Sequence, residues 1–536
     1  MSTTVEVLAD SLKEIGTDVV VGHPGGETVE LMDALRERDM RYILMKQEVA
    51  AAMVAATWGE LKGVPGMSTS TRGPGATNMV NGVAHAWLDR APMIALTDQY
   101  PAHTYETGLR QVIDHQAIYK PITKWSTRMQ AKTAHQQVRR AIRTAMAPTP
   151  GPVHIDMPAT ETTAEAPEIT FAPSMLPNEQ GIRPDRDALK VPLEMIRNAR
   201  KPIILVGLGV FWDKASDEMV KLAETLGAPV LTTSKCKGAI PEDHALRAGC
   251  IIGGLIEREL ISQSDLVITL GVDCVELQPK SWPYGIPLLS IVNTPTLEAL
   301  IPATLEVVGD IKLITQSLTE FSDGGSNWGE KAAAKFRDDL NNALNVATSY
   351  MSPQAAMEVA RDVLPRDTIA TCDAGASRLL VVQKWKSYAP RQFLTSNGLG
   401  SMGIAIPAAL AARLAHPERP VVAFTGDGGF MMAVAELQTA AKENLPITVV
   451  IWDDREIALI RIKQELKGIE KFGIDLGGVD YEKLAAGFGA DGVCVETEHQ
   501  LGDALAAAAK SNRSTLIAAR IDGSCYVEQF NALREL

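Results

Sequence analysis

The fold of this chain is predicted from one stretch of sequence, Val421-Val-Ala-Phe-Thr-Gly-Asp-Gly-Gly-Phe430. Its apolar first half leads to the glycine-flanked Asp427, and a second apolar run at 447–452 leads to Asp453 and to Asp454, which lies 27 positions after Asp427. Short runs that are apolar throughout are typical of parallel strands buried on both faces. Because such strands end at the same edge of their sheet, these acidic residues are expected to converge. The stretch therefore predicts an α/β domain with carboxylates at one sheet edge.

Short apolar strands alternate with helical patterns in three blocks of the chain. The blocks are separated by the proline-rich stretch 162–185 and by Ser322-Asp-Gly-Gly-Ser-Asn327. Strands are expected at 18–21, 41–45, 66–69 and 93–96, at 202–207, 228–232, 265–271 and 287–292, and at 368–372, 393–396, 421–425, 447–452 and 515–519. For 536 residues this pattern predicts three doubly wound α/β domains with parallel sheets, spanning 1–165, 186–325 and 350–536.

The composition argues against several classes of function. The 52 basic and 65 acidic residues give a net charge of −13, which argues against a general affinity for nucleic acid or an anionic membrane. No uninterrupted apolar run approaches the ~20 residues that a bilayer requires. The six cysteines include no C-x-x-C pair, and reduced thiols are typical of the cytosol. We therefore expect a soluble, cytoplasmic protein without nucleic-acid or membrane partners.

One motif favours a dinucleotide site, because Gly398-Leu-Gly-Ser-Met-Gly403 matches G-x-G-x-x-G. It follows the strand expected at 393–396, and Asp427 lies 24 positions beyond it. Two features weaken this interpretation: Pro407 lies close to the start of the following helix, and Asp427 stands in a glycine-flanked turn. A tight turn without any ligand is the alternative.

The convergence of acidic residues favours a metal site instead. The carboxylates of Asp427 and Asp454 would repel each other unless a divalent cation lay between them. Mg²⁺ typically binds one or two carboxylates together with phosphate oxygens. Gly428 and Gly429 would let a phosphate approach backbone N–H groups at the start of a helix.

The spacing of these residues resembles the thiamine diphosphate signature, which begins G-D-G and ends in an Asn/Asp pair. Here it begins at Gly426 and ends at Asp453 and Asp454, with Asp453 where many members have Asn. The resemblance implies that Asp427 and Asp454 are Mg²⁺ ligands, with the backbone carbonyl of Glu456 as a third.

The resemblance extends over the whole chain and includes four segments of the first block. They are similar to the pyrimidine-binding domain of the acetolactate synthase and decarboxylase superfamily: Gly22-His-Pro-Gly-Gly26, Lys46-Gln-Glu48, Arg72-Gly-Pro-Gly-Ala-Thr-Asn78 and Leu88-Asp-Arg-Ala-Pro92. Glu48 would then be the activating glutamate, which shares a proton with a pyrimidine nitrogen and promotes the imino tautomer. The alternative is an acidic residue favoured by the macrodipole in the first turn of a helix.

The resemblance also implies further cofactor contacts. Met402 matches the bulky apolar residue on which the cofactor bends, although a core methionine is the commoner case. The other implied cofactor-binding residues are Pro24, Gly25, Asn78, Ala376, Ser377, Gly400, Gly426, Gly428 and Gly429.

On the substrate side, the resemblance implies His23, Gln111 and His115 as catalytic candidates beside Glu48. A single histidine in Gln111-Val-Ile-Asp-His115 is nearer to the synthase pattern than to the decarboxylase pattern with its His pair. A surface histidine is an equally good interpretation of His115. The central block lacks the segments expected of flavin-binding relatives, so no FAD is expected in it.

We therefore expect an enzyme that depends on thiamine diphosphate and Mg²⁺ and that joins a decarboxylated 2-oxo acid to a carbonyl acceptor. The resemblance further implies a homodimer or homotetramer, with Glu48 from one subunit and Asp427, Asp454 and Met402 from another completing each site. Three alternatives remain open: a non-ligating 2-oxo acid decarboxylase or aldehyde lyase, an NAD-dependent dehydrogenase, and a binding or regulatory protein with an inactive site.

Overall fold

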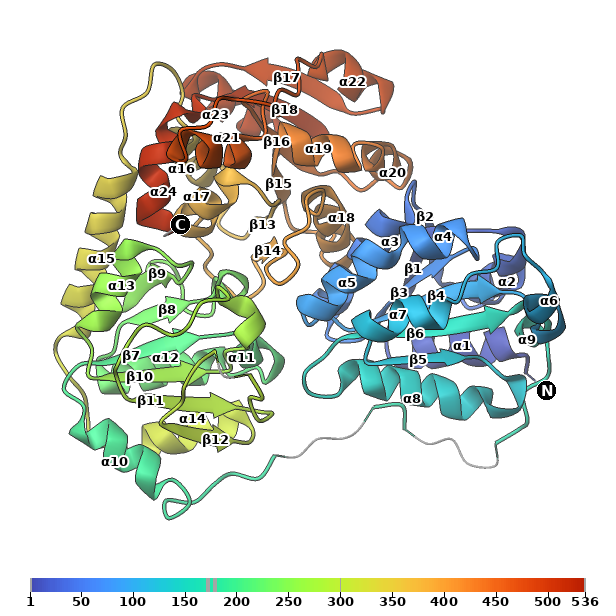
Figure 1. Ribbon diagram of the computed structural model, residues 1–536, viewed down its shortest axis with the longest axis horizontal. Helices are drawn as coiled ribbons and strands as arrows, with labels where there is room; N and C mark the ends of the chain where they lie inside the picture. The colour runs from blue at the N-terminus through green and yellow to red at the C-terminus, as the bar shows by residue number, and fades with distance from the viewer. Residues whose placement is uncertain (1, 170–173, 177–180, 299, 535–536) are drawn as a thin grey trace.

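Three α/β domains make up the chain in the computed structural model (Figure 1). The structure describes residues 2–169, 174–176, 181–298 and 300–534. Each domain is built on a six-stranded sheet whose paired strands are parallel. The predicted class of three doubly wound parallel-sheet domains is thereby confirmed.

The N-terminal domain has the strand order β2-β1-β3-β4-β6-β5. Its strands are β1 (Val19–His23), β2 (Arg41–Leu44), β3 (Gly66–Ser70), β4 (Met93–Gln99), β5 (Trp125–Arg128) and β6 (Pro152–Pro158). Its helices are α1 (Thr4–Glu14), α2 (Val29–Arg36), α3 (Glu48–Lys62), α4 (Pro74–Asn78), α5 (Val80–Leu88), α6 (Ala102–Thr107), α7 (His115–Tyr119), α8 (Ala134–Met146) and α9 (Ala159–Thr162).

The central domain has the strand order β12-β11-β10-β7-β8-β9, with β7 and β10 at the point where the order reverses. Its strands are β7 (Pro202–Val206), β8 (Val230–Thr232), β9 (Arg247–Cys250), β10 (Leu266–Leu270), β11 (Leu288–Val292) and β12 (Leu305–Val308). Its helices are α10 (Lys190–Asn198), α11 (Gly209–Trp212), α12 (Ser216–Leu226), α13 (Leu255–Ser262) and α14 (Ile311–Phe321), and α15 (Gly329–Leu344) leads out of it.

The C-terminal domain repeats the topology of the first, with the order β14-β13-β15-β16-β18-β17. Its strands are β13 (Ile369–Cys372), β14 (Phe393–Thr395), β15 (Val421–Gly426), β16 (Thr448–Asp453), β17 (Asp491–Val495) and β18 (Thr515–Arg520). Its helices are α16 (Pro353–Val363), α17 (Ala376–Lys384), α18 (Ala405–Ala415), α19 (Asp427–Ala433), α20 (Glu436–Lys442), α21 (Ala458–Leu466), α22 (Tyr481–Gly487), α23 (Glu498–Ala508) and α24 (Tyr526–Leu533).

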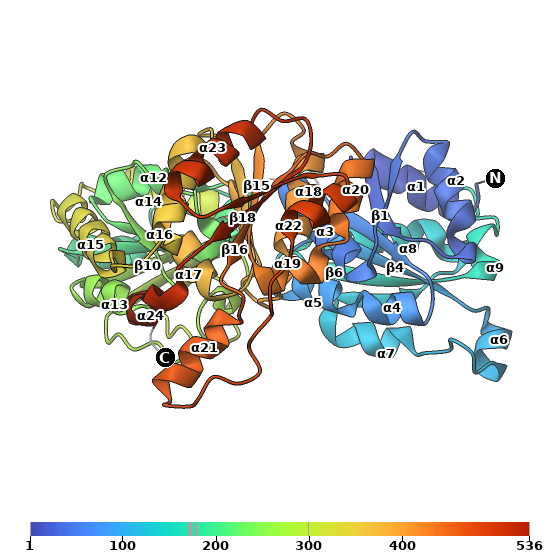
Figure 2. The same cartoon turned by 90° about the horizontal axis from the view of Figure 1, so that it is seen from above.

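Helix α3 lies between the first and third sheets, because its alanine-rich surface is apolar on nearly every side. It packs closely on β3, where a side chain at Gly66 would lie 2.0 Å from the carbonyl oxygen of Ala55. Its far face meets the alanine-rich α18, and Figure 2 shows the two helices side by side. The helix ends at Lys62 and is capped by Gly63, whose φ of 69° is a conformation that glycine adopts readily. This packing fixes the start of α3 at Glu48 between two domains.

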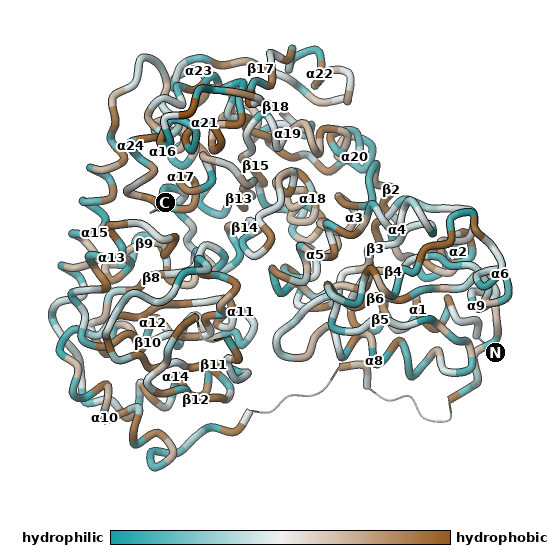
Figure 3. Tube along the Cα trace, in the orientation of Figure 1, coloured by the Kyte–Doolittle hydropathy of each residue, from teal (hydrophilic) through white to brown (hydrophobic). Residues whose placement is uncertain are grey.

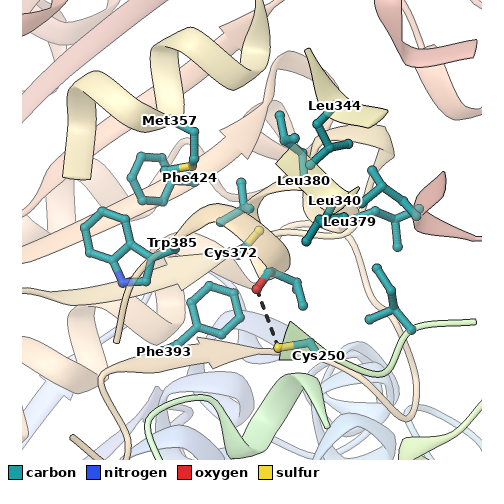
Figure 4. Packing of buried hydrophobic residues seen from close by; sticks show 14 of the residues in the cluster. Cys250, Leu340, Leu344, Met357, Cys372, Leu379, Leu380, Trp385, Phe393 and Phe424 are labelled. Atoms are coloured by element: carbon teal, nitrogen blue, oxygen red, sulfur yellow. Dashed lines mark hydrogen bonds between the residues drawn. The ribbon is translucent and has the colours of Figure 1, made fainter. Parts of the chain in front are cut away.

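The central and C-terminal domains share a hydrophobic core. Cys250 at the end of β9 packs in the same cluster as Trp385, which follows α17, and Phe393 and Phe424 of the third sheet (Figure 4). Figure 3 shows hydrophobic residues gathered along the strands and alternating with hydrophilic ones along outer helices such as α8. Within the described residues, no helix has the length and hydropathy that a membrane crossing needs.

The stretch predicted as a linker, 162–185, begins at the last residue of α9. Its described residues form no further helix or strand, apart from one bridge between Glu165 and Thr3. Two of its prolines, Pro173 and Pro177, lie outside the described residues.

Candidate cofactor and active site

The predicted acidic residues lie at the switch point of the third sheet. The chain leaves β13 toward β14 on one side and leaves β15 toward β16 on the other. Ligands of open α/β sheets bind in the crevice that such a reversal opens at the carboxyl ends of the strands. Asp373 follows β13 directly, and Asp427 follows β15 as the first residue of α19.

Asp427 and Asp454 share a crowded, partly buried environment. Burial raises the pKa of Asp427 to about 6, with nearby carboxylates adding to the rise. Burial followed by the charge of Asp427 raises the pKa of Asp454 to about 7. The Oδ2 atom of Asp427 is buried without a hydrogen-bond partner. Two oxygen ligands that destabilise each other, one of them unsatisfied, fit a hard divalent cation such as Mg²⁺.

Glu456 offers its backbone rather than its side chain to such a cation. Its carboxylate is bound by Arg461 and lies 3.6 Å from Lys471. Its carbonyl oxygen accepts the N–H of Ala458 at 2.9 Å, which leaves one lone pair. No cluster of three or more acidic, histidine or cysteine side chains able to hold a metal occurs in the described part of the chain. The residues present thus fit a site with two carboxylates and a carbonyl.

The glycines of this turn are required by close packing. A Cβ at Gly429 would lie 2.5 Å from Oδ2 of Asp373 and 3.0 Å from Oγ1 of Thr425. A Cβ at Gly428 would lie 3.0 Å from Ile457 and 3.4 Å from the methyl group of Met402. Gly426, by contrast, faces open space.

The remaining predicted contacts of the C-terminal domain surround the same edge. Ala376 and Ser377 form the first turn of α17, after a Gly375 with φ of 144°. Gly400 has a φ of 67° and lies in the loop before α18. Met402 is only half-buried, so the interpretation as a core methionine is wrong. Its contact with Gly428 places an apolar side chain beside the acidic pair.

Sequence reasoning missed Asp373, which joins the loops around this edge. Its carboxylate accepts the N–H of Gly403 at 2.8 Å and the hydroxyl of Thr425 at 3.0 Å. Burial raises its pKa to about 6, against the effect of these hydrogen bonds. Its position directly after β13 was the available signal, because strand ends at a switch point carry functional residues.

The dinucleotide interpretation of residues 398–403 is wrong. The strand before the motif, β14, is the edge strand of its sheet, and β13 separates it from β15. Asp427 therefore does not lie on the strand next to the motif, as the acidic residue of a dinucleotide site must. The loop instead donates the Gly403 N–H to Asp373.

Glu48 is the first residue of α3, as predicted, and α4 holds its carboxylate. The amide of Asn78 donates to Glu48 Oε2 at 2.5 Å. Gly75 leaves room for the other oxygen, because a Cβ there would lie 3.1 Å from Oε1. Glu436, which sequence reasoning also missed, accepts the N–H groups of Lys46 at 3.0 Å and Gln47 at 3.2 Å. A side chain of the C-terminal domain thus fixes the residues just before Glu48.

The other N-terminal candidates differ in their surroundings. His23, with Pro24 and Gly25 after it, ends β1 and is exposed, and its Nδ1 lies 3.0 Å from the Met45 carbonyl oxygen. Gln111 is exposed with a φ of 58°. His115 is fully buried, so the surface interpretation is wrong.

Models of known protein families match all three domains. The "Thiamine pyrophosphate enzyme, N-terminal TPP binding domain" matches residues 2–118, the corresponding "central domain" matches 189–318, and the "C-terminal TPP binding domain" matches 373–519. Glu48 lies in the N-terminal match, and the Asp427–Asp454 pair lies in the C-terminal match.

Curated relatives cover nearly the whole chain. It is 30% identical to a probable acetolactate synthase large subunit of Methanococcus aeolicus, over 97% of this chain and 92% of the relative. It is 32% identical to an acetolactate synthase large subunit of Parasynechococcus marenigrum (strain WH8102), over 95% of this chain and 86% of the relative. It is 28% identical to an acetolactate synthase of Bacillus subtilis (strain 168), over 97% of this chain and 93% of the relative. The chain therefore belongs to the thiamine pyrophosphate enzyme family and is homologous to acetolactate synthase large subunits.

Proposed function

We propose that this protein uses thiamine diphosphate and Mg²⁺ to decarboxylate a 2-oxo acid and transfer the remaining fragment to a carbonyl acceptor. The observation that carries the proposal is the acidic pair of Asp427 and Asp454, with Oδ2 of Asp427 buried and unsatisfied, at the switch point of a sheet whose domain matches the family. Thiamine diphosphate, when bound, supplies the electron sink that lets a 2-oxo acid lose CO₂. No flavin is part of the proposal.

In this proposal the C-terminal domain holds the cofactor. Asp427, Asp454 and the Glu456 carbonyl hold Mg²⁺, which neutralises the diphosphate in an acidic protein. The first turn of α17 at Ala376 and Ser377 offers backbone N–H groups to phosphate oxygens. Met402, beside Gly428, would offer the cofactor an apolar contact and exclude water there.

Glu48 moves the proton in the N-terminal domain. Its Oε2 accepts the Asn78 amide, which leaves Oε1 to share a proton with a pyrimidine nitrogen. The fixed carboxylate costs little reorganisation during proton transfer. His23 and Gln111, both exposed, border the side from which a 2-oxo acid and its acceptor would enter.

We further propose a homodimer or homotetramer with shared sites. In one chain Glu48 and the acidic pair belong to different domains (Figure 1). Apolar side chains close to the acidic pair are exposed in the single chain, with Met431 46% and Met432 56% exposed on α19. A second copy would cover them and bring its Glu48 to the bound cofactor.

Reconstitution with thiamine diphosphate and Mg²⁺, followed by a screen of 2-oxo acids with product identification, tests the proposal. Acetolactate-type products support ligation, whereas free aldehyde with CO₂ alone would replace it with a simple decarboxylase. Glu48→Gln is expected to lower the rate by about 10²- to 10⁴-fold. Glu30→Gln is the matched control, since Glu30 also lies in the first turn of a helix but is exposed. Equal effects of the two variants would contradict the role of Glu48.

Mixed oligomers test the shared site. Glu48→Gln and Asp454→Asn subunits are each expected to be inactive alone. A hybrid dimer contains one site with both native residues only if the two residues come from different subunits. Recovery of partial activity after mixing therefore supports shared sites, and no recovery in demonstrated hybrids contradicts them.

A further inference from the structure

A chain of hydrogen bonds runs from β6 to the carboxylate of Glu48, buried from Asp156 to α4 and exposed at its last bond, between Asn78 and Glu48. We propose that His115 is a positioning residue: held by Asp156, it fixes α4, and α4 fixes Glu48. The inference rests on the proposed function, because it concerns the same activating glutamate. It assigns His115 a role different from the contact with substrate that family resemblance implied.

The hydrogen bonds of His115 determine the tautomer of its ring. The backbone N–H of Gly73 lies 3.2 Å from Nε2, and because an N–H can only donate, Nε2 accepts. A neutral ring then carries its proton on Nδ1, which lies 3.3 Å from the amide nitrogen of Gln99 and 2.9 Å from Oδ1 of Asp156; the Asp156 oxygen is closer and can only accept, so it takes the proton. The side chain is completely buried. Both ring nitrogens are thus occupied, and neither is left to exchange a proton with a substrate.

Asp156 keeps the ring of His115 in this orientation. Burial alone would raise the pKa of Asp156, but hydrogen bonds from His115 and Thr97, with the nearby imidazoles, hold that pKa below its usual range. The Thr97 hydroxyl donates to the same Oδ1 at 2.7 Å. The ionised carboxylate therefore accepts the Nδ1 proton and fixes the tautomer that Gly73 requires.

Helix α7 holds α4 at two points. His115, the first residue of α7, accepts the N–H of Gly73 immediately before α4. Tyr119, the last residue of α7, donates its hydroxyl to the carbonyl oxygen of Ala76 within α4 at 2.5 Å. The two bonds thus hold α4 at its N-cap and in its middle.

Helix α4 in turn positions Glu48. It ends at Asn78, whose amide lies 2.5 Å from Oε2, and it carries Gly75, the residue that faces Oε1. A small movement of α4 therefore displaces both contacts of the carboxylate at once. Misplacement of a catalytic group by about 1 Å costs on the order of 100-fold in rate.

Two matched variants test the roles of the two ring nitrogens of His115 separately. His115→Asn keeps a donor near the Nδ1 position but cannot reach Gly73, whereas His115→Gln places a carbonyl oxygen near the Nε2 position. The probe is thiamine diphosphate itself: the exchange of its C2 proton with deuterium, followed by NMR in the Mg²⁺-loaded enzyme, reports the action of Glu48 without any substrate. We expect His115→Asn to slow this exchange by about 10- to 100-fold and His115→Gln to recover most of the loss.

Tyr119→Phe is the independent variant, because it loosens α4 without touching His115. It is expected to slow exchange as well, and the KM for the 2-oxo acid should stay within about threefold in all variants. If His115→Asn and Tyr119→Phe both exchange the C2 proton at the rate of the native enzyme, the inference is overturned. If His115→Asn exchanges the proton at the native rate but loses turnover, His115 acts on the substrate instead. If the native enzyme fails to bind thiamine diphosphate, or Glu48→Gln exchanges normally, the proposed function itself fails.

Discussion

Oδ2 of Asp453 lies 3.2 Å from the guanidinium of Arg520, which also donates to the Asp453 backbone carbonyl at 3.2 Å. The two residues are direct partners across the parallel strands β16 and β18. Arg520 therefore neutralises the acidic residue that stands where many related sequences have Asn. Asp454, the next residue, interacts with Asp427, and the Asp453 carboxylate, although paired with Arg520, also helps to raise the pKa of Asp427.

Substitution of Asp454 or of its neighbour Asp453 by asparagine should have unequal effects on cofactor binding. Asp454→Asn removes a metal ligand and is expected to weaken Mg²⁺-dependent binding of thiamine diphosphate more than the ~10- to 100-fold typical of outer-shell partners. Asp453→Asn should stay at or below that range, because Arg520 keeps its bond to the Asp453 carbonyl. Calorimetric titration at fixed Mg²⁺ measures both. Equal losses would show that Asp453 also contacts the metal.

Two glycines of the same turn should differ in their tolerance of alanine. Gly429→Ala forces a methyl group to 2.5 Å from the Asp373 carboxylate and is expected to destabilise the cofactor-free protein by about 1–3 kcal/mol. Gly426→Ala is the control, because it faces open space and its φ of −78° suits any residue. Thermal unfolding without cofactor checks the pair. Similar midpoints for both variants would contradict the packing argument.

The sequence predicts buried strands well and half-exposed or polar strands poorly. Central strands such as β15 are apolar throughout, which is the pattern that identifies them. The edge strands β5 and β17 were not predicted, because exposure on one side interrupts that pattern. Strand β6 was also missed although it is fully buried, since His154 and Asp156 occur within it. Buried polar residues with distant partners look like loop residues in a single sequence.

The residues of the candidate site also fall into those that the sequence predicts and those that it does not. Asp427, Asp454 and Glu48 lie in short motifs whose spacing is visible in the sequence. Asp373 and Glu436 act through partners that are far away along the chain, such as Lys46 for Glu436 across 390 positions. Such contacts depend on how domains pack, and no local periodicity encodes them.

Glu257 should make the stability of the central domain depend on pH. The residue is 4% exposed, and its carboxylate accepts the N–H groups of Ile252 at 2.7 Å and Gly253 at 2.6 Å. Burial raises its pKa from 4.5 to about 8, although these hydrogen bonds act in the opposite direction. The unfolded chain therefore loses this proton first as pH rises. The free energy of unfolding should fall between about pH 4.5 and 8, by at most about 1.4 kcal/mol per pH unit.

Glu257→Gln carries no titrating group and should remove this part of the pH dependence. The variant is expected to gain stability relative to the native protein as pH increases. Urea midpoints at several values between about pH 5 and 8 test the difference. If the urea midpoints of the two proteins changed with pH in parallel, that result would contradict the raised pKa of Glu257.

Lys235 belongs to a buried ion cluster that joins all three domains, and its loss should lower stability. Its ammonium lies 2.8 Å from Glu60 and 3.4 Å from Asp89 of the N-terminal domain, and Arg391 of the C-terminal domain lies 2.8 Å from the same Glu60. The charges of Lys235 and His85 hold the pKa of Asp89 far below its usual range against the effect of burial. Removing the ammonium leaves Asp89 buried with too little positive charge.

Lys235→Met is therefore expected to destabilise the protein by about 3–5 kcal/mol, because breaking a buried pair strands a buried charge. Lys335→Met is the control, since its pairs with Glu259 and Asp339 are exposed and should leave the unfolding midpoint unchanged. Because three domains unfold together only if their contacts hold, Lys235→Met should also split one thermal transition into two or more. Calorimetry measures both effects. A single transition at the native midpoint would show that hydrophobic contacts, and not this ion cluster, hold the domains together.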